Sequence, residues 1–329
     1  MRFAARTVLL SMAFLTAGLA QAQAPTSERP LEAPGPLGPL KGTLLLPRSM
    51  PNAVVLIIPG SGAADRDGNS PAGVKASTYR LLAEGLASRG IATARIDKRG
   101  MFGSAAAVKD ANAATFSGYG DDVKAWVAVL RKETGAPCVW VLGHSEGGLV
   151  ALSSARDVAD ECGLLLVSTP GRRMADVLRA QLTDNPANAP LLGFALPAID
   201  ALEQGRHVDT RDMPPVLLGL FRPAVQDFLI SMFSLDQPRL VAAVTKPVLI
   251  LQGQRDLQVT EADARLLAKG DPRATLVLLP NVNHVLKTVA SDDRQANFAT
   301  YADPSLPLAP GVVDAIAGFL AKNPSAPTH

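Results

Sequence analysis

Residues 139–150 read VWVLGHSEGGLV, an apolar run that ends in a histidine and a serine enclosed by glycines. A continuous apolar run of this kind is typical of a strand buried on both faces of a sheet. The glycines indicate a sharp turn, because a Cβ atom at either flanking position would clash in it. The pentapeptide GHSEG (143–147) has the spacing G-x-S-x-G, which holds a serine hydroxyl above the sheet between a strand and a helix. Ser145 is therefore either the reason for the turn or an incidental part of it.

The rest of the chain alternates apolar runs with amphipathic segments. The apolar runs, which we predict to be strands, cover residues 41–47, 53–62, 91–97, 138–142, 163–167, 247–253 and 274–280. The amphipathic segments, which we predict to be helices, cover residues 79–90, 119–135, 146–158, 260–269 and 311–322. Strands that alternate with helices indicate right-handed crossovers and a parallel sheet. The predicted fold class is α/β, with a mostly parallel sheet and helices on both of its faces.

Two stretches depart from this alternation. Residues 23–39 are rich in proline and glycine, which predicts an extended lead-in to the first strand. Residues 171–245 contain no convincing strand, but they carry scattered prolines and helical patches such as MADVLRAQL. We interpret residues 171–245 as a helical cap insertion that lies over the sheet. The α/β core that it interrupts is then formed by residues 23–170 and 246–329.

The composition excludes several classes of protein. Of the 329 residues, 47% are hydrophobic and 19% are charged, which is enough apolar material for a folded core and too much for a disordered chain. The formal net charge is +2, and the sequence contains no long run of basic residues. We therefore expect no nucleic-acid partner and no membrane-surface partner.

The first residues have the pattern of a cleaved secretory signal. Arg2 and Arg6 precede an apolar stretch, and small residues in an Ala-x-Ala pattern follow it. We expect residues 1–22 to be a signal peptide with cleavage after Ala22, so that the protein is exported to the periplasm or secreted. A retained membrane anchor is the alternative, although the apolar stretch is shorter than the ~20 residues that span a bilayer. We expect no stable membrane anchor after cleavage.

Export makes a disulfide chemically feasible for the only two cysteines, Cys138 and Cys162. Cys138 opens one predicted strand, and Cys162 directly precedes another. If these strands are parallel neighbours about 4.8 Å apart, the two residues lie at the same end of the sheet and within disulfide range. The sequence leaves two alternatives open, a disulfide and two buried free thiols.

Reactive groups of an open parallel sheet gather at the carboxyl ends of its strands. Ser145 lies at such an end, and a serine hydroxyl is a poor nucleophile unless a base activates it and a third group orients that base. His284 in LLPNVNHVLK follows the last predicted strand, whereas His144 belongs to the turn and should point away from the neighbouring hydroxyl. Asp256 in QRDLQV follows the preceding strand. We predict a catalytic triad of Ser145, Asp256 and His284, in the chain order that G-x-S-x-G enzymes of this sheet type use.

Acyl transfer also needs N–H donors for the oxyanion of the tetrahedral intermediate. The backbone N–H of Glu146, at the start of the helix that follows Ser145, should be one donor. The second should come from the loop PGSGAADRDGN, which begins at residue 59 after another predicted strand. We assign this donor to Ser61, with Gly62 as the alternative.

Charged side chains near these donors need their own explanation. The side chain of Glu146 must turn outward or bond locally if it is not to oppose an oxyanion. In the loop after residue 59, Asp65, Arg66 and Asp67 stand next to one another. We expect them to pair among themselves and hold the loop, or one of them to touch the substrate.

Together these motifs resemble the α/β-hydrolase superfamily. The segments GHSEGG, GQRDLQV and NVNHVLK carry this resemblance, and PGSGAADRDGN with STPGRRMADVLRAQL resembles the bacterial exported esterase branch, also described as serine aminopeptidase-like hydrolases. The similarity covers nearly the whole mature chain and is weakest in the insertion. It implies the α/β-hydrolase fold, with Ser145 as nucleophile, His284 as base, Asp256 as its orienting acid, and Ser61 and Glu146 as oxyanion donors. No cofactor and no metal are expected.

A nucleophilic serine excludes the dehalogenase and epoxide-hydrolase branches, which place an aspartate at that position. We expect hydrolysis of carboxylic esters, with a small-molecule ester as the substrate. A peptidase or aminopeptidase is an alternative with the same triad, and so is an acyltransferase or thioesterase. A binding protein without turnover is disfavoured, because it has no use for all three residues. Six apolar residues of the insertion are candidates either for an acyl pocket or for helix packing: Leu191, Leu192, Phe194, Phe221, Phe228 and Phe233.

Overall fold

The computed structural model describes residues 26–325. The segment 1–22, which the sequence analysis interprets as a signal peptide with cleavage after Ala22, lies outside the described residues, and so does His329.

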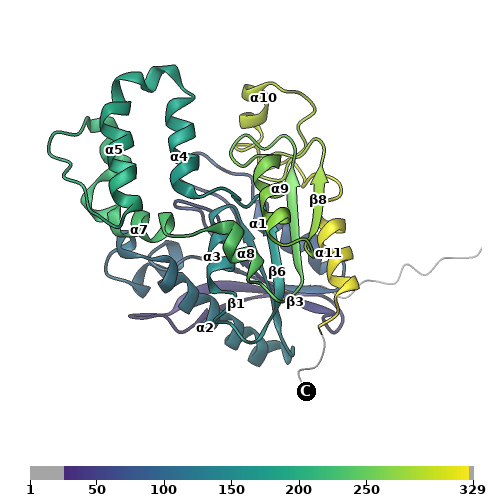
Figure 1. The fold of residues 1–329 in the computed structure, drawn as a ribbon. Coiled ribbons are helices and arrows are strands. Elements are labelled where there is room, and N and C mark those ends of the chain that lie inside the picture. The colour runs from purple at the N-terminus through teal and green to yellow at the C-terminus, as the bar shows by residue number, and fades with distance from the viewer. Residues whose placement is uncertain (1–25, 326–329) are drawn as a thin grey trace, which may run out of the picture.

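One eight-stranded sheet forms the centre of the molecule (Figure 1). In spatial order its strands are β1 (Ser27–Ala33), β2 (Leu40–Leu46), β4 (Ile91–Ile96), β3 (Ala53–Ile58), β5 (Val139–His144), β6 (Glu161–Val167), β7 (Val248–Gly253) and β8 (Thr275–Leu279). The pairs β1–β2 and β2–β4 are antiparallel, and every other neighbouring pair is parallel. The predicted α/β fold with a mostly parallel sheet is confirmed.

The first strand is a correction to the sequence analysis. Residues 23–39 were expected to form an extended lead-in, whereas Ser27–Ala33 form β1 and pair with β2 along their whole length. Pro30 is tolerated there because β1 is an edge strand, where a missing backbone N–H removes no bond to a second neighbour. Leu31 and Ala33 alternate with exposed residues and are buried, which is the signature of a strand covered on one face only.

Helices cover both faces of the sheet. The helices α2 (Phe116–Thr134), α3 (Glu146–Ser154) and α9 (Glu261–Gly270) pack on one face, and α1 (Thr78–Ala87) and α11 (Val312–Lys322) pack on the other. Successive side chains of β3 enter the two hydrophobic clusters in turn, because strand side chains alternate between faces. This burial on both faces explains why the central strands are apolar throughout.

Between β6 and β7 the chain is helical. The segment forms α4 (Met174–Thr183), α5 (Leu192–Glu203), α6 (Pro215–Phe221), α7 (Pro223–Phe233) and α8 (Gln237–Ala242), and the described residues 168–247 contain no strand. In Figure 1, α4 and α5 stand side by side and project beyond the sheet. The remaining elements are α10 (Arg294–Ala299) and three 3-10 turns, η1 (Phe102–Ala107), η2 (Ala111–Ala113) and η3 (Pro186–Leu191).

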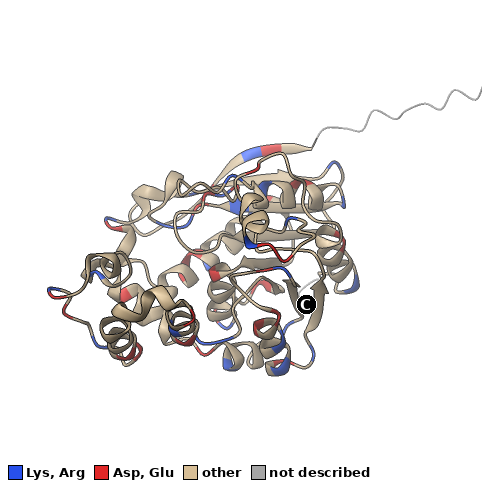
Figure 2. Cartoon of the chain, turned by 90° about the horizontal axis from the view of Figure 1, so that it is seen from above, with Lys and Arg blue, Asp and Glu red and all other residues tan. Residues whose placement is uncertain are grey.

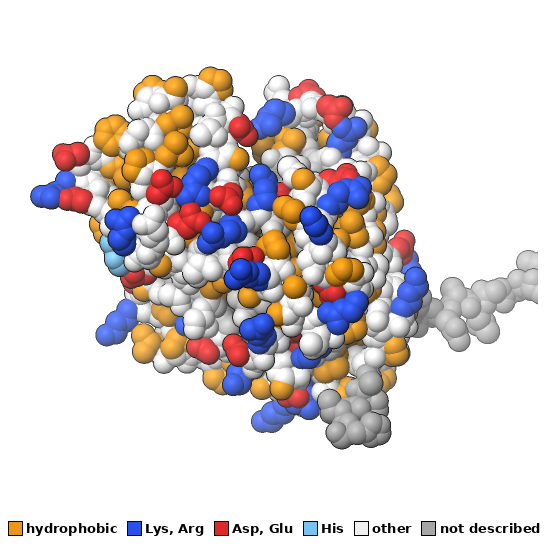
Figure 3. All heavy atoms as spheres, in the orientation of Figure 1, with side chains coloured by type: hydrophobic (Ala, Val, Ile, Leu, Met, Phe, Trp, Pro, Cys, Tyr) orange, Lys and Arg blue, Asp and Glu red, His pale blue; other side chains and the backbone are white. Residues whose placement is uncertain are grey.

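Two further observations concern helix length and surface charge. Within residues 26–325 no single helix is long and apolar enough to cross a membrane, and α6 with α7, bent by 54° at their junction, reach that length and hydropathy only as a pair. Lysine and arginine residues are interspersed with acidic residues along the chain (Figure 2) and over the face drawn in Figure 3. This mixture agrees with the small formal net charge of +2.

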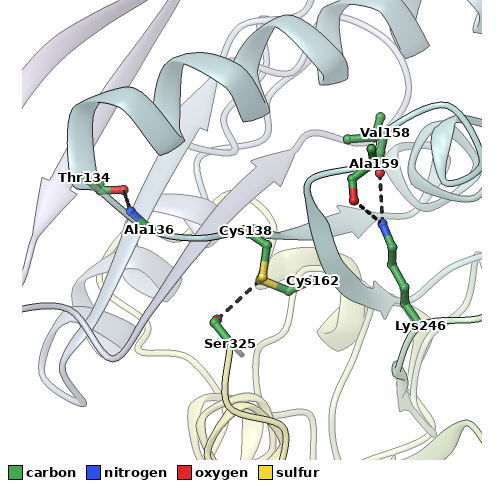
Figure 4. Close-up of a disulfide and its surroundings, with 8 residues drawn as sticks. All are labelled: Thr134, Ala136, Cys138, Val158, Ala159, Cys162, Lys246 and Ser325. Carbon is green, nitrogen blue, oxygen red and sulfur yellow. Dashed lines mark hydrogen bonds between the residues drawn. A yellow bond between two sulfur atoms is a disulfide. The ribbon is translucent and has the colours of Figure 1, made fainter. Parts of the chain in front are cut away.

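Cys138 and Cys162 form a disulfide, with their Cα atoms 5.2 Å apart (Figure 4). Cys138 immediately precedes β5 and Cys162 lies near the start of β6, and these two strands are parallel neighbours. Of the two alternatives that the sequence leaves open, the structure therefore contains the disulfide. It lies at the amino ends of the strands, and Ser145 lies beyond the carboxyl end of β5.

Candidate active site

Ser145 occupies the turn between β5 and α3 in a strained backbone conformation. Its φ of 55° and ψ of −122° place a residue with a Cβ atom in a region that such residues rarely adopt. The turn is closed tightly around it: a Cβ atom on Gly143 would lie 2.2 Å from the Gly147 carbonyl oxygen, and one on Gly147 would lie 2.3 Å from the Ile58 carbonyl oxygen. The glycines are therefore required by the close approach of α3 to β5 and β3.

His284 and Asp256 are in direct contact. Nδ1 of His284 lies 2.7 Å from Oδ2 of Asp256, whose side chain is completely buried. Oδ1 of Asp256 accepts the backbone N–H groups of Gln258, at 2.8 Å, and Val259, at 2.9 Å. Burial alone would raise the pKa of Asp256, but the charge and hydrogen bond of His284 and the two backbone N–H groups outweigh it and lower the pKa. The carboxylate therefore stays ionised and fixes the orientation of the imidazole.

Ser145 and His284 line the same small cavity, which has a volume of about 150 Å³. Within residues 26–325 the Ser145 hydroxyl makes no hydrogen bond to His284, and catalytic hydrogen bonds often tighten only when substrate is bound. The structure thus brings all three residues of the predicted triad to one edge of the sheet, with the His–Asp contact already formed.

His144 points away from the neighbouring hydroxyl, as the sequence analysis expects. Its Nε2–H donates to the backbone oxygen of His284 at 2.8 Å, and its Nδ1 lies 2.9 Å from the hydroxyl of Tyr79. Burial, aided by the charge of His284, lowers the pKa of His144 to about 3, so the ring is neutral and Nδ1 accepts the Tyr79 O–H. The Tyr79 oxygen in turn accepts the backbone N–H of Gly60 at 2.9 Å. His207 lies apart, on the surface beside Asp227.

Of the two predicted oxyanion donors, Glu146 directly follows Ser145 at the start of α3, and Ser61 lies in the loop after β3. Within the described chain, neither the Ser61 N–H nor the Glu146 N–H donates a hydrogen bond to another protein group. Both residues line a cavity together with Ser145. A Cβ atom on Gly60 would lie 3.2 Å from Cβ of Ser145, so glycine allows the loop after β3 to approach this closely. Both N–H groups are therefore without a protein partner in residues that line a cavity with Ser145, as the prediction requires.

The Glu146 side chain is bonded locally. Its Oε1 accepts from Nζ of Lys98 at 2.8 Å, and both side chains are buried. Nζ of Lys98 also donates to the backbone oxygen of Gly60 at 2.7 Å. Lys98 was not among the predicted site residues, although its place two residues after the end of β4 was a usable signal.

The charged loop residues bond differently from one of our expectations. Asp65, Arg66 and Asp67 do not pair among themselves: Arg66 pairs with Asp97, and Asp67 lies 3.4 Å from Arg95. The carboxylate of Asp65 instead accepts backbone N–H groups of its own loop. Arg95 lies at the end of β4, and Asp97 is the residue after this strand. The charged side chains of the loop therefore attach it to the sheet and do not bind one another. None of the three lines either cavity at Ser145.

A larger cavity of about 420 Å³ also reaches Ser145, and it is lined by the serine turn and by the helices α4, α6 and α7. Besides Ser61, Gly62, Ser145, Glu146, Pro170, Gln181 and Gly219, its lining is apolar: Met174, Leu178, Leu220, Val225, Phe228, Leu229 and Met232. Of the six apolar candidates from the sequence analysis, only Phe228 lines it. Phe221 and Phe233 are buried in the core, Phe194 is partly exposed on α5, and Leu191 and Leu192 also lie outside the cavity lining.

The apolar residues that line the larger cavity, of which the sequence predicted only Phe228, share a helical spacing. Met174 and Leu178 are four residues apart on α4, and Val225, Phe228, Leu229 and Met232 occupy one face of α7. Apolar residues at helical spacing on each helix would have marked these two faces as candidates, although Leu229 and Met232 also pack in the core. In the described part of the chain, histidine, cysteine and acidic side chains form no group of three that could hold a metal ion.

A parallel sheet with a serine on the strand-to-helix turn, and an aspartate and a histidine after later strands, is the arrangement of α/β hydrolases. A model of the Alpha/beta hydrolase family matches residues 54–300. The chain belongs to this family.

Relatives and solved structures agree with this assignment. Esterase EstD of Thermotoga maritima is 26% identical over 252 residues, which are 75% of this chain and 58% of EstD, so the chain spans less than two thirds of that relative. The structure of Est1E from Butyrivibrio proteoclasticus matches with a TM-score of 0.57 at 18% identity, over 89% of this chain and 98% of that one. The Pyrococcus furiosus esterase Pf2001 matches with a TM-score of 0.55 at 15% identity, over 92% and 94%. At these identities the two structures share the fold.

Proposed function

We propose that this protein hydrolyses carboxylic esters through an acyl-enzyme on Ser145. The observation that carries the proposal is the 2.7 Å contact between His284 Nδ1 and Asp256 Oδ2, beside a cavity that Ser145 also lines. Asp256 is the acid that orients His284, and the N–H groups of Ser61 and Glu146 are the oxyanion donors. The similarity to an esterase at 26% identity supports an ester as the substrate.

In the first half of the reaction, the Ser145 hydroxyl oxygen attacks the ester carbonyl carbon and Nε2 of His284 takes the hydroxyl proton. The carbonyl oxygen becomes an oxyanion, which accepts the N–H groups of Ser61 and Glu146. The tetrahedral intermediate collapses when the bond to the alkoxy oxygen breaks. His284 returns the proton to this oxygen, so that an alcohol leaves and the acyl group stays on Ser145.

In the second half, a water molecule takes the place of the alcohol. His284 removes one proton from the water, whose oxygen attacks the acyl carbon and forms a second oxyanion in the same hole. Collapse of this intermediate releases the carboxylic acid, and the proton on His284 returns to the Ser145 oxygen. The carboxylate of Asp256 stabilises the imidazolium in both halves.

We propose that the two cavities bind different parts of the ester substrate. The leaving alcohol must lie near His284, because this residue protonates it, and His284 lines only the small cavity of about 150 Å³. The acyl chain then occupies the apolar cavity of about 420 Å³ under α4, α6 and α7. We therefore propose esters of an apolar acid with a small alcohol, and a cap role for the helices between β6 and β7.

An aminopeptidase is a weaker candidate for the same triad. Such an enzyme needs a carboxylate that is free to hold the substrate's ammonium group. Among the residues that line the two cavities, the only carboxylate belongs to Glu146, and it is already paired with Lys98.

Export to the periplasm or secretion is also a proposal. A disulfide between Cys138 and Cys162 supports it, because disulfides persist mainly in oxidising compartments. Fractionation of the producing cells, followed by sequencing of the mature amino terminus, tests it. The expected terminus is Gln23, and an intact amino terminus in the cytoplasmic fraction contradicts the proposal.

The function is tested by turnover of p-nitrophenyl acetate, butanoate and hexanoate, together with leucine p-nitroanilide, which carries the ammonium group that an aminopeptidase would hold. We expect kcat/KM to rise along the ester series by roughly 10-fold for each added pair of methylene groups, and the esters to react faster than the anilide. Ser145→Ala should lower kcat by at least about 10⁴-fold. Preferred cleavage of the anilide would favour the peptidase, and turnover that survives the substitution would contradict the mechanism.

A further inference from the structure

We propose that Lys98 is a positioning residue of the oxyanion hole, and that it acts on both donors of the hole at once. The inference rests on the proposed function. Lys98 follows β4, which lies beside β3 in the sheet, and its side chain is 2% exposed. A lysine this deeply buried requires partners for its ammonium group.

The first partner fixes the peptide that carries the Ser61 donor. Nζ of Lys98 donates to the Gly60 carbonyl oxygen at 2.7 Å. In a planar trans peptide the carbonyl oxygen and the N–H of the next residue point in opposite directions. Holding the Gly60 oxygen therefore sets the direction of the Ser61 N–H, which is free of other protein partners within the described residues.

The opposite side of Gly60 is held as well, because its N–H donates to the Tyr79 hydroxyl at 2.9 Å. Because the Gly60 N–H and the Gly60 carbonyl are both bonded, neither of the two peptides that flank Gly60 can rotate without losing a buried hydrogen bond. The second donor is therefore Ser61 rather than Gly62, because within the described residues no hydrogen bond holds the Ser61–Gly62 peptide.

The second partner of the Lys98 ammonium group is the carboxylate of Glu146, whose negative charge it neutralises. Oε1 of Glu146 lies 2.8 Å from Nζ of Lys98, and Glu146 is the residue whose backbone N–H forms the other half of the hole. A buried, unpaired carboxylate there would oppose the developing oxyanion, since charges interact strongly where water is excluded. The ammonium group makes the pair neutral. It also lies 5.6 Å from the ring centre of Tyr119, which is close enough for a cation–π contact.

A stabilising role alone does not account for this arrangement. Replacement of a buried ion pair by apolar residues is often neutral or stabilising, so such a pair is weak evidence for stability. The neighbouring pair of Arg99 and Asp122 provides the comparison. Nε of Arg99 lies 2.7 Å from Oδ2 of Asp122 on α2, and both side chains are largely buried. Arg99 also donates to the Gly118 carbonyl oxygen of α2, so this pair is bonded to α2 and not to the loop after β3.

Lys98→Met and the matched control Arg99→Met test the inference by steady-state kinetics on p-nitrophenyl butanoate. We expect Lys98→Met to lower kcat by about 100-fold with KM within about threefold of the wild-type value, because the oxyanion exists only after attack. Affinity for a trifluoromethyl ketone that forms a tetrahedral adduct should fall by a similar factor. Arg99→Met should keep kcat within about threefold even where it lowers the melting temperature.

The double variant Lys98→Met/Glu146→Gln separates the two effects and leaves no unpaired charge, so it remains informative if Lys98→Met fails to fold. It should recover about 10-fold of the lost kcat and stay about 10-fold below wild type, because the Gly60 carbonyl remains unsupported. Wild-type kcat in Lys98→Met, or an equal loss in Arg99→Met, overturns the inference. If Ser145→Ala abolishes turnover in the same assay, such a result leaves the proposed function intact. If it does not, the function itself fails.

Discussion

The hydroxyl of Tyr79, on α1, lies 2.9 Å from Nδ1 of His144 at the end of β5, and this contact connects the helix to the strand that precedes Ser145. Tyr79 accepts the Gly60 N–H from the loop after β3, and His144 donates to the backbone oxygen of His284 in the loop after β8. The histidine of the G-x-S-x-G motif is therefore a neutral bridge between the loop after β3 and the predicted base.

Tyr79→Phe removes both hydrogen bonds of this hydroxyl and leaves its ring in place. We expect kcat to fall by about 10-fold, the equivalent of one or two hydrogen bonds, with little change in KM. Steady-state kinetics on p-nitrophenyl butanoate measures both constants. An unchanged kcat would show that the bridge does not align the reacting groups.

Asp256→Asn tests the orienting acid. The asparagine oxygen can still accept the N–H groups of Gln258 and Val259, but its amide nitrogen then faces Nδ1 of His284 and favours the wrong tautomer. We expect kcat to fall by about 10³- to 10⁴-fold. Asp263→Asn is the matched control, since Asp263 is equally buried but pairs with Arg172. A similar loss in the control would indicate a general structural effect.

Leu178→Trp fills part of the apolar cavity from α4. Because the acyl chain is proposed to lie there, the ratio of kcat/KM for hexanoate to that for acetate should fall by at least about 10-fold. Leu182→Trp, one turn later on α4 and outside the cavity lining, should leave this ratio unchanged. If Leu178→Trp instead lowers both rate constants equally, the acyl chain lies elsewhere.

The sequence was informative where local chemistry determines structure. Apolar runs predicted seven of the strands, and the requirement for glycine around Ser145 predicted the turn. Asp256 and His284 could be selected because both follow strands of the same sheet. The edge strand β1 was not predicted, because Pro30 and charged residues interrupt its apolar pattern, and an edge strand tolerates both.

Contacts between distant segments could not be predicted in the same way. Lys98 is 38 residues from Gly60 and 48 from Glu146, and only the order of strands in the sheet brings them together. The partners of Arg66 and Asp67 were missed for the same reason, because they lie on β4 or directly after it. The cavity lining depends on how α4 and α7 are placed, which no local pattern specifies.

Glu161 provides a prediction about stability. It is buried at the start of β6, and within residues 26–325 neither carboxyl oxygen has a hydrogen-bond partner. Burial, opposed by the charge of Lys246, raises the pKa of Glu161 from 4.5 to about 8. The folded state therefore holds this proton between pH 4.5 and about 8 while the unfolded state releases it, so folding stability falls as the pH rises through this window.

Glu161→Gln removes this proton uptake. Relative to wild type, the variant should gain up to about 1.4 kcal/mol of unfolding free energy for each pH unit in that window. Urea denaturation of both proteins at pH 5 and pH 8 measures the difference. A constant difference between the two pH values would contradict the buried, protonated carboxyl.

The central claim is that Ser145 carries the acyl group. The most direct measurement is rapid mixing with p-nitrophenyl butanoate, an acid quench, and mass spectrometry of the digested protein. We expect a burst of p-nitrophenol stoichiometric with enzyme, and one butanoyl group on the peptide that contains Ser145. A butanoyl group on another residue, or an equal burst from Ser145→Ala, would contradict it.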